Sequence, residues 1–171
     1  KKHRAYEFSK VSDQILTLFS FEPQYFKKFN IKTSYVGHPI FFEKKKKLQL
    51  KKTEKEKIIT FFPGSRLNEI KYIFPKMILI MKHISKEFPQ FKLKIISVPH
   101  LFDEIKKRAK GIKYEIISSN IKKKKAMENS FFAFAASGTV TLELSFLRIP
   151  MIVVYDSNII TSFIIKRSVQ V

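Results

Sequence analysis

From residue 58 onward, the sequence alternates between short apolar runs and longer segments whose apolar residues recur at a helical spacing. The apolar runs are four to seven residues long and cover residues 58–62, 92–98, 114–117, 131–135 and 151–155. The helical segments cover residues 69–88, with a break expected at Pro75, and residues 101–110, 121–129, 140–147 and 159–167. No obvious hairpin turn joins two runs, and this alternation favours a parallel sheet covered by helices on both faces. We therefore predict an α/β fold for this part of the chain.

The first part of the chain shows a shorter version of the same pattern. The expected elements are a helix, a strand, a second helix and a second strand, at residues 5–14, 15–19, 22–29 and 33–36. The second helix is predicted from Pro23, because proline suits a first helical turn. Residues 41–57 contain four consecutive lysines and little periodic apolar content, which indicates a linker or surface helix between two units.

The composition excludes several classes of protein. Lysine and arginine number 34 against 14 acidic residues, for a formal net charge of +20, yet 44% of the residues are hydrophobic, enough for a folded core. No apolar run approaches the roughly 18 residues that a membrane span needs. The absence of cysteine excludes disulfides and thiol catalysis and is typical of a reducing compartment such as the cytoplasm. The chain begins with neither methionine nor a signal pattern, so we expect a fragment.

Two runs of four lysines, residues 44–47 and 122–125, could contact nucleic acid or anionic lipid. We interpret both as solvated surface, because the chain is rich in lysine throughout and contains no motif of a known nucleic-acid-binding fold. A basic nucleic-acid-binding domain is kept as the alternative from a different class. The histidines are not spaced like a ligand set, so no metal site is predicted.

The first candidate site is the loop Pro63-Gly64-Ser65-Arg66, which follows the 58–62 run. Ligands of open parallel sheets bind beyond the carboxyl ends of the strands, where this loop is expected to lie. A glycine, a hydroxyl and a guanidinium before a helix suit an anion, because free amides and the helix dipole attract phosphate. A tight turn with Ser65 as the helix cap and Arg66 in solvent is the alternative on residue types alone.

The second candidate site is the loop Ser137-Gly138-Thr139, in the same position after the 131–135 run. Glu143 lies in the first turns of the next helix, one residue past the capping-box position counted from Thr139. Its carboxylate could accept two hydroxyl hydrogen bonds from a ribose, or could stabilise the helix dipole. Residues 118–120 end another strand and could lie beside a base or sugar, although they are also good turn formers.

Five short motifs occur in order along nearly the whole chain. They are Phe21-Glu22-Pro23, Val36-Gly37-His38-Pro39, Pro63-Gly64-Ser65-Arg66 with Glu69-Ile70, Ala136-Ser137-Gly138-Thr139-Val140-Thr141-Leu142-Glu143, and Pro150-Met151-Ile152-Val153-Val154-Tyr155. Each motif is weak alone, but their order and separations together closely resemble the lipid-A-disaccharide synthase family. Ser20 is a departure, since the family usually has proline before Phe-Glu.

The resemblance implies an inverting, metal-independent GT-B-type glycosyltransferase with two Rossmann-like domains and no cofactor. Enzymes of this family transfer 2,3-diacylglucosamine from UDP-2,3-diacylglucosamine to 2,3-diacylglucosamine 1-phosphate, which yields lipid A disaccharide 1-phosphate and UDP. The implied location is the cytoplasm of a Gram-negative bacterium, peripheral at the inner face of the inner membrane, on an anionic lipid surface. The resemblance is compatible with a homodimer, although the sequence does not give the oligomeric state, and nucleic acid is not an expected partner.

The same resemblance assigns roles to the two loops. Arg66 would be catalytic, by neutralising the charge that builds on the leaving UDP, and Glu143 would take the ribose hydroxyls. The general base is expected outside this chain, so the chain alone is expected to be inactive. The residues expected to bind the UDP-sugar donor are Gly64, Ser65, Arg66, Ser137, Gly138, Thr139, Thr141 and Glu143.

The resemblance also divides the chain into parts. Residues 1–40 would be the end of the N-terminal acceptor domain, residues 41–57 a linker, and residues 58–171 a truncated C-terminal domain that binds the UDP-sugar. The alternative among enzymes is another UDP-sugar transferase or an epimerase of the same fold, which would use Glu143 in the same way.

Overall fold

The structure is a computed structural model and describes residues 2–42 and 57–156. The chain divides into two compact units, Lys1–Gln49 and Leu50–Val171, and each unit has its own parallel sheet. Most of the predicted linker, at residues 43–56, and the predicted last helix, at residues 159–167, lie outside the described residues. The assignment of acceptor and donor roles to the two units stays a prediction.

The first unit contains two short parallel strands after a helix. Its elements are α1 (Lys2–Val11), β1 (Gln14–Thr17), the 3₁₀ turns η1 (Pro23–Tyr25) and η2 (Lys27–Phe29), β2 (Lys32–Tyr35) and a third 3₁₀ turn, η3 (Pro39–Phe41). The Glu22 carboxylate accepts hydrogen bonds from the Leu18 and Phe19 amides, at 2.9 and 2.8 Å, and so closes the turn after β1.

The prediction of one helix over residues 22–29 is wrong in kind, because two 3₁₀ turns occupy this segment. Pro23 does begin the first turn, as its fixed backbone angle predicts. Asn30 then ends the second turn in the left-handed conformation, with φ at 55°. Each of the two turns spans three residues, and the 3₁₀ form is the usual one for such short pieces.

The second unit is a five-stranded parallel sheet with the strand order β5-β4-β3-β6-β7. Every neighbouring pair is parallel, which confirms the predicted fold class. The predicted runs differ from the strands by at most two residues at either end. The strands are β3 (Ile58–Phe62), β4 (Lys92–Ile96), β5 (Glu115–Ile117), β6 (Phe132–Ala136) and β7 (Met151–Val154).

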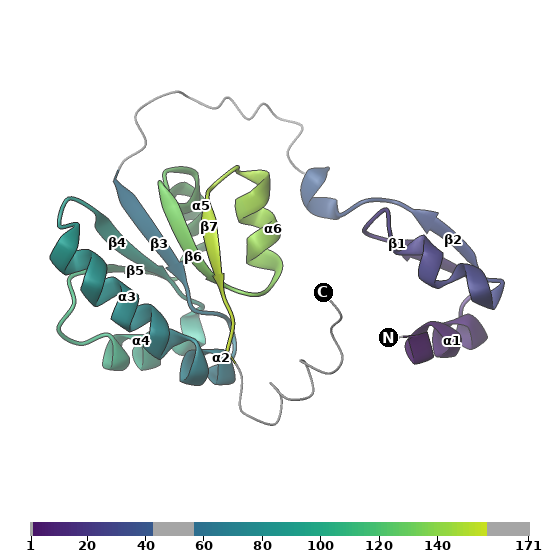
Figure 1. Ribbon diagram of the computed structural model, residues 1–171, viewed down its shortest axis with the longest axis horizontal. Coiled ribbons are helices and arrows are strands. Elements are labelled where there is room, and N and C mark those ends of the chain that lie inside the picture. Colours follow the sequence, from purple (N-terminus) through teal and green to yellow (C-terminus); the bar gives the residue numbers. More distant parts are fainter. Residues whose placement is uncertain (1, 43–56, 157–171) are drawn as a thin grey trace. The chain divides into compact units, whose positions relative to one another are not determined.

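Helices cover both faces of this sheet (Figure 1). Pro75 lies in the first turn of α3, where its missing N–H costs no hydrogen bond, and the break predicted near it separates α2 from α3. Among the described residues, no helix is long and apolar enough to cross a membrane. The helical elements are α2 (Leu67–Tyr72), α3 (Phe74–Glu87), the 3₁₀ turn η4 (Pro99–Leu101), α4 (Phe102–Arg108), α5 (Asn120–Glu128) and α6 (Thr139–Phe146).

The apolar character of β3 follows from its place at the centre of the sheet, with all five residues buried. Successive side chains point to opposite faces, so β3 contributes to two cores. Phe61 belongs to the core formed with α2, α3 and α4, and Phe62 belongs to the core formed with α5 and α6. Phe61 also stacks on Phe134 of β6, with ring centroids 5.1 Å apart. Burying one such ring stabilises the fold by about 1.5–3 kcal/mol.

The strand order reverses at the centre of the sheet. After β3 the chain builds outward through β4 and β5, and it then returns to place β6 on the other side of β3. The loops after β3 and β6 lead to helices on opposite faces, so a crevice lies between them at the carboxyl ends of the strands. The register pairs Phe62 with Ala135, so both loops begin at the same level of the sheet.

Candidate functional site

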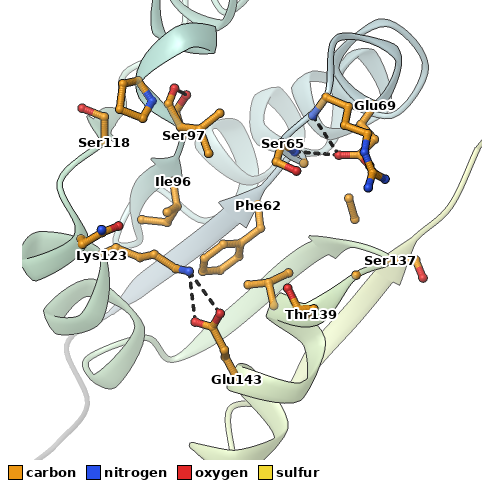
Figure 2. A pocket seen from close by; sticks show the side chains of 18 residues that line it. Phe62, Ser65, Glu69, Ile96, Ser97, Ser118, Lys123, Ser137, Thr139 and Glu143 are labelled. Atoms are coloured by element: carbon orange, nitrogen blue, oxygen red, sulfur yellow. Dashed lines mark hydrogen bonds and ion pairs between the residues drawn. The ribbon is translucent and has the colours of Figure 1, made fainter. Parts of the chain in front are cut away.

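A cavity of about 370 Å³ occupies this crevice, within the roughly 300–1,000 Å³ that small-ligand sites usually measure. Figure 2 shows that its side chains come from the loops after several strands and from α5 and α6. Ser118 and Asn120, which the sequence allowed either as turn formers or as neighbours of a base or sugar, line it as well. Thr141 does not. Seven of the eight predicted donor-binding residues line the cavity: Gly64, Ser65, Arg66, Ser137, Gly138, Thr139 and Glu143.

The first loop is built around the carboxylate of Glu69. Its Oε2 atom accepts hydrogen bonds from the backbone amides of Ser65, at 2.6 Å, and Arg66, at 3.2 Å. The two amides that we expected to be open to an anion therefore already have an anionic partner within the chain. Ser65 is not the helix cap, because α2 begins after Arg66. Glu69 is the residue that satisfies the amides before the helix, in the manner of the acid in a capping box.

Gly64 is required by this arrangement for two separate reasons. Its φ angle is 114°, a backbone conformation that residues with a side chain rarely adopt. A Cβ atom at this position would overlap the Glu69 carboxylate and would lie 2.6 Å from Glu69 Cβ. The glycine thus lets the Glu69 side chain lie directly against the loop backbone.

The Arg66 side chain extends from the first loop toward solvent. It is 81% exposed, and its Nη1 atom lies 3.3 Å from Oε1 of Glu69. A pair this exposed contributes little to stability. The contact engages one nitrogen of the guanidinium and leaves most of its N–H donors accessible.

The second loop is closed by Thr141. The Thr141 hydroxyl donates to the Gly138 carbonyl at 2.7 Å, and the Thr141 amide donates to the same oxygen at 3.1 Å. Thr141 therefore holds the loop through the Gly138 carbonyl, and its expected contact with a ligand stays a prediction. Ser137 and Thr139 are exposed at the cavity, so their hydroxyls are available to a ligand.

Glu143 has a partner that the sequence interpretation missed. Lys123 of α5 places its Nζ atom 3.0 Å from Oε2 and 3.3 Å from Oε1 of Glu143, and both side chains line the cavity. Lys123 belongs to the run that we interpreted as solvated surface. Four consecutive residues of a helix point to different sides of it. When the helix packs on a sheet, one residue of such a run therefore faces toward the protein and not toward solvent. That periodicity was the available signal.

A second cavity, of about 570 Å³, lies at the opposite ends of the strands. It is lined by residues at or just before the beginnings of β4 and β5, including Lys92, Lys113 and Glu115. Although it is larger, it lies at the amino ends of parallel strands, where ligands of this fold do not usually bind. Among the described residues, no group of three or more potential ligand side chains could hold a metal ion.

A doubly wound parallel sheet with a ligand-sized cavity at the reversal of strand order defines a Rossmann-like α/β domain. The family model for lipid-A-disaccharide synthetase matches residues 1–171. The chain therefore belongs to the lipid-A-disaccharide synthetase family.

Curated relatives carry the corresponding name. The chain is 31% identical to lipid-A-disaccharide synthase 2 of Legionella pneumophila strain Lens and 33% identical to lipid-A-disaccharide synthase of Rickettsia typhi, in each case over 100% of the chain and 47% of the relative. It is 34% identical to the synthase of Helicobacter acinonychis, over 98% of the chain and 44% of the relative. The chain thus spans about half the length of the curated relatives it matches.

The geometry around Gly64 predicts an unusually large cost for a single methyl group. We expect Gly64→Ala to lower the free energy of unfolding by about 2 kcal/mol or more, because it combines an unfavourable φ with overlap on Glu69. Gly111→Ala is the matched control, since Gly111 has a φ of 80° but no atom within 4 Å of the added Cβ. We expect about 1 kcal/mol there. Urea unfolding followed by circular dichroism measures both, and equal losses would contradict the role given to Glu69.

Proposed function

We propose that the cavity binds the UDP part of UDP-2,3-diacylglucosamine. The whole protein then transfers the diacylated sugar to 2,3-diacylglucosamine 1-phosphate and releases UDP. Family membership and the shared name of the relatives support this reaction class. The observation that carries the proposal is the convergence of Arg66 and Glu143 on one cavity. Arg66 lies in the loop after β3, and Glu143 lies in α6, the helix that follows the adjacent strand β6. The Arg66 guanidinium suits a diphosphate, and the Glu143 carboxylate suits a ribose.

Arg66 supplies positive charge to the diphosphate. A guanidinium can bind phosphate oxygens through two parallel hydrogen bonds, and the exposed position of Arg66 leaves donors accessible for this. When the sugar is transferred, negative charge builds on the departing UDP. A cation that is already in place stabilises that charge as it develops, which is a large contribution to catalysis. No cofactor or metal enters this account.

Gly138 allows the diphosphate to approach the backbone of the second loop. Its φ is 170°, which is extended backbone that any residue adopts, and an added Cβ would meet no atom within 4 Å. Neither the backbone conformation nor packing among the residues that the structure describes explains a glycine there. A phosphate lying against the peptide would explain the glycine, as in dinucleotide-binding loops, where a glycine lets the pyrophosphate approach the backbone. Ser137, Thr139 and the amides before α6 add hydrogen-bond donors beside it.

The remaining parts of the proposal concern the setting of the reaction. We propose a cytoplasmic protein held peripherally at the inner face of the inner membrane, where both acylated substrates lie. The net charge of +20 supports attraction to an anionic lipid surface, at about 1 kcal/mol for each basic residue near that surface. A homodimer belongs to the same proposal and rests on family resemblance alone.

Calorimetric titration of the 171-residue chain with UDP tests the proposal. We expect UDP to bind, and Arg66→Ala to weaken binding by about tenfold or more, because charge-assisted hydrogen bonds to phosphate are lost. Arg108→Ala is the matched control, since Arg108 pairs with Glu104 on α4 and does not line the cavity.

Absence of UDP binding by the folded chain, or equal binding by Arg66→Ala, would contradict the proposal. Salt-sensitive binding of mixed-sequence RNA without UDP binding would favour a basic nucleic-acid-binding domain instead.

Close approach of a phosphate to Gly138 predicts that a substitution there weakens UDP binding without lowering the free energy of unfolding. We expect Gly138→Ala to leave the free energy of unfolding within about 0.5 kcal/mol of the parent chain, because no atom of the described residues lies within 4 Å of the added methyl group. The same variant is expected to weaken UDP binding by about tenfold, because the methyl group holds the phosphate away from the amides. Unfolding and calorimetry on one preparation check both values. Unchanged UDP affinity would refute the close approach.

A further inference from the structure

We propose that Lys123 is a positioning residue that orients the Glu143 carboxylate for ribose recognition. The inference rests on the proposed function, because it takes Glu143 to accept the ribose hydroxyls of UDP. It concerns a residue of the 122–125 lysine run, for which the sequence alone indicated only solvated surface.

The four lysines of this run have different surroundings in α5. Lys122, Lys124 and Lys125 are exposed, whereas Lys123 is half-buried, with 31% of its side chain accessible. Lys123 is also the member of the run that lines the cavity, and its Nζ atom lies within hydrogen-bond distance of both Glu143 oxygens. Figure 2 shows the lysine reaching across from α5 to the carboxylate on α6.

The geometry leaves Glu143 able to accept further hydrogen bonds. A carboxylate has about four acceptor positions on its two oxygens, and one ammonium group cannot fill them all. The two adjacent hydroxyls of a ribose need two acceptors at a fixed spacing, so the orientation of the carboxylate plane decides whether both are met. An ion pair to both oxygens restricts that orientation before the ligand arrives, and preorganisation of this kind raises affinity.

The burial of the pair also matters for its strength. Glu143 is 33% accessible, similar to Lys123, so the two charges attract each other more strongly than an exposed pair does. The pair joins α5 to α6, which follow β5 and β6 on the same face of the sheet. Lys123 therefore acts on the ribose through Glu143, from a different helix.

The first measurement is the affinity of the 171-residue chain for UDP, by calorimetry. We expect Lys123→Met to weaken binding by about fivefold, the order of one partly buried ion pair, and Lys123→Arg to recover most of the loss. Lys124→Met is the matched control: it removes the same charge from the same helix at an exposed position and is expected to leave UDP affinity unchanged. Equal losses in Lys123→Met and Lys124→Met would overturn the inference, since they would reflect net charge alone.

The second measurement asks whether Lys123 acts through Glu143 on the ribose. We expect Lys123→Met to have little further effect in a Glu143→Gln background, as coupled residues do in a double-mutant cycle. We also expect it to reduce the preference of the chain for UDP over 2′-deoxy-UDP. A full additional loss in the Glu143→Gln background would show that Lys123 acts on the ligand independently of Glu143, and an unchanged preference for UDP would show that it does not act on the ribose. Either result would overturn the positioning role.

Different results would contradict the proposed function and the inference on Lys123. A folded parent chain that does not bind UDP would refute the proposed function and this inference together. UDP binding that Lys123→Met leaves intact would refute the inference and leave the proposed function standing.

Discussion

The parallel pairing of β3 with β6 is the contact on which the candidate site depends. Phe62 of β3 and Ala135 of β6 are 73 residues apart in sequence, and the sheet pairs them side by side. Their buried rings, Phe61 and Phe134, stack at the centre of the core. Because the chain leaves β3 for one face and β6 for the other, the pairing itself creates the crevice. A fold with β3 and β6 apart would separate Arg66 from Glu143.

Each charged group assigned to the ligand has a counter-charge within the chain. Arg66 lies beside Glu69, and Glu143 lies beside Lys123. Neither pair is deeply buried, so holding these charges ready costs little desolvation. In the proposed function, the nucleotide would add its contacts to an ion pair that already exists at Glu143. Such preorganisation means that less conformational freedom is lost when the nucleotide binds. The first loop needs a glycine for its own construction because Glu69 lies directly against Gly64, whereas an added Cβ at Gly138 would meet no atom within 4 Å.

The sequence predicted the centre of the sheet well because β3 and β6 are buried on both faces, which makes them short, unbroken apolar runs. The two glycine loops were also predictable, since strand-to-helix loops of parallel sheets share one edge. The use of the Ser65 and Arg66 amides was not, because it depends on how the Glu69 side chain folds back over Gly64. Likewise, the lysine run did not indicate which member faces Glu143, and the 3₁₀ turns after Pro23 depend on the left-handed Asn30. The net charge was the least informative feature for locating the site, because it does not depend on where the basic residues lie in the chain.

The central claim is that UDP binds at the reversal of strand order. Amide resonances of the isotope-labelled chain, followed by NMR during titration with UDP, test this most directly. The account predicts that the largest shifts fall in residues 64–66 and 137–139, the two loops that line the cavity. Shifts confined to the second cavity, around Lys92 and Lys113, would contradict it, as would a folded chain whose spectrum UDP does not change.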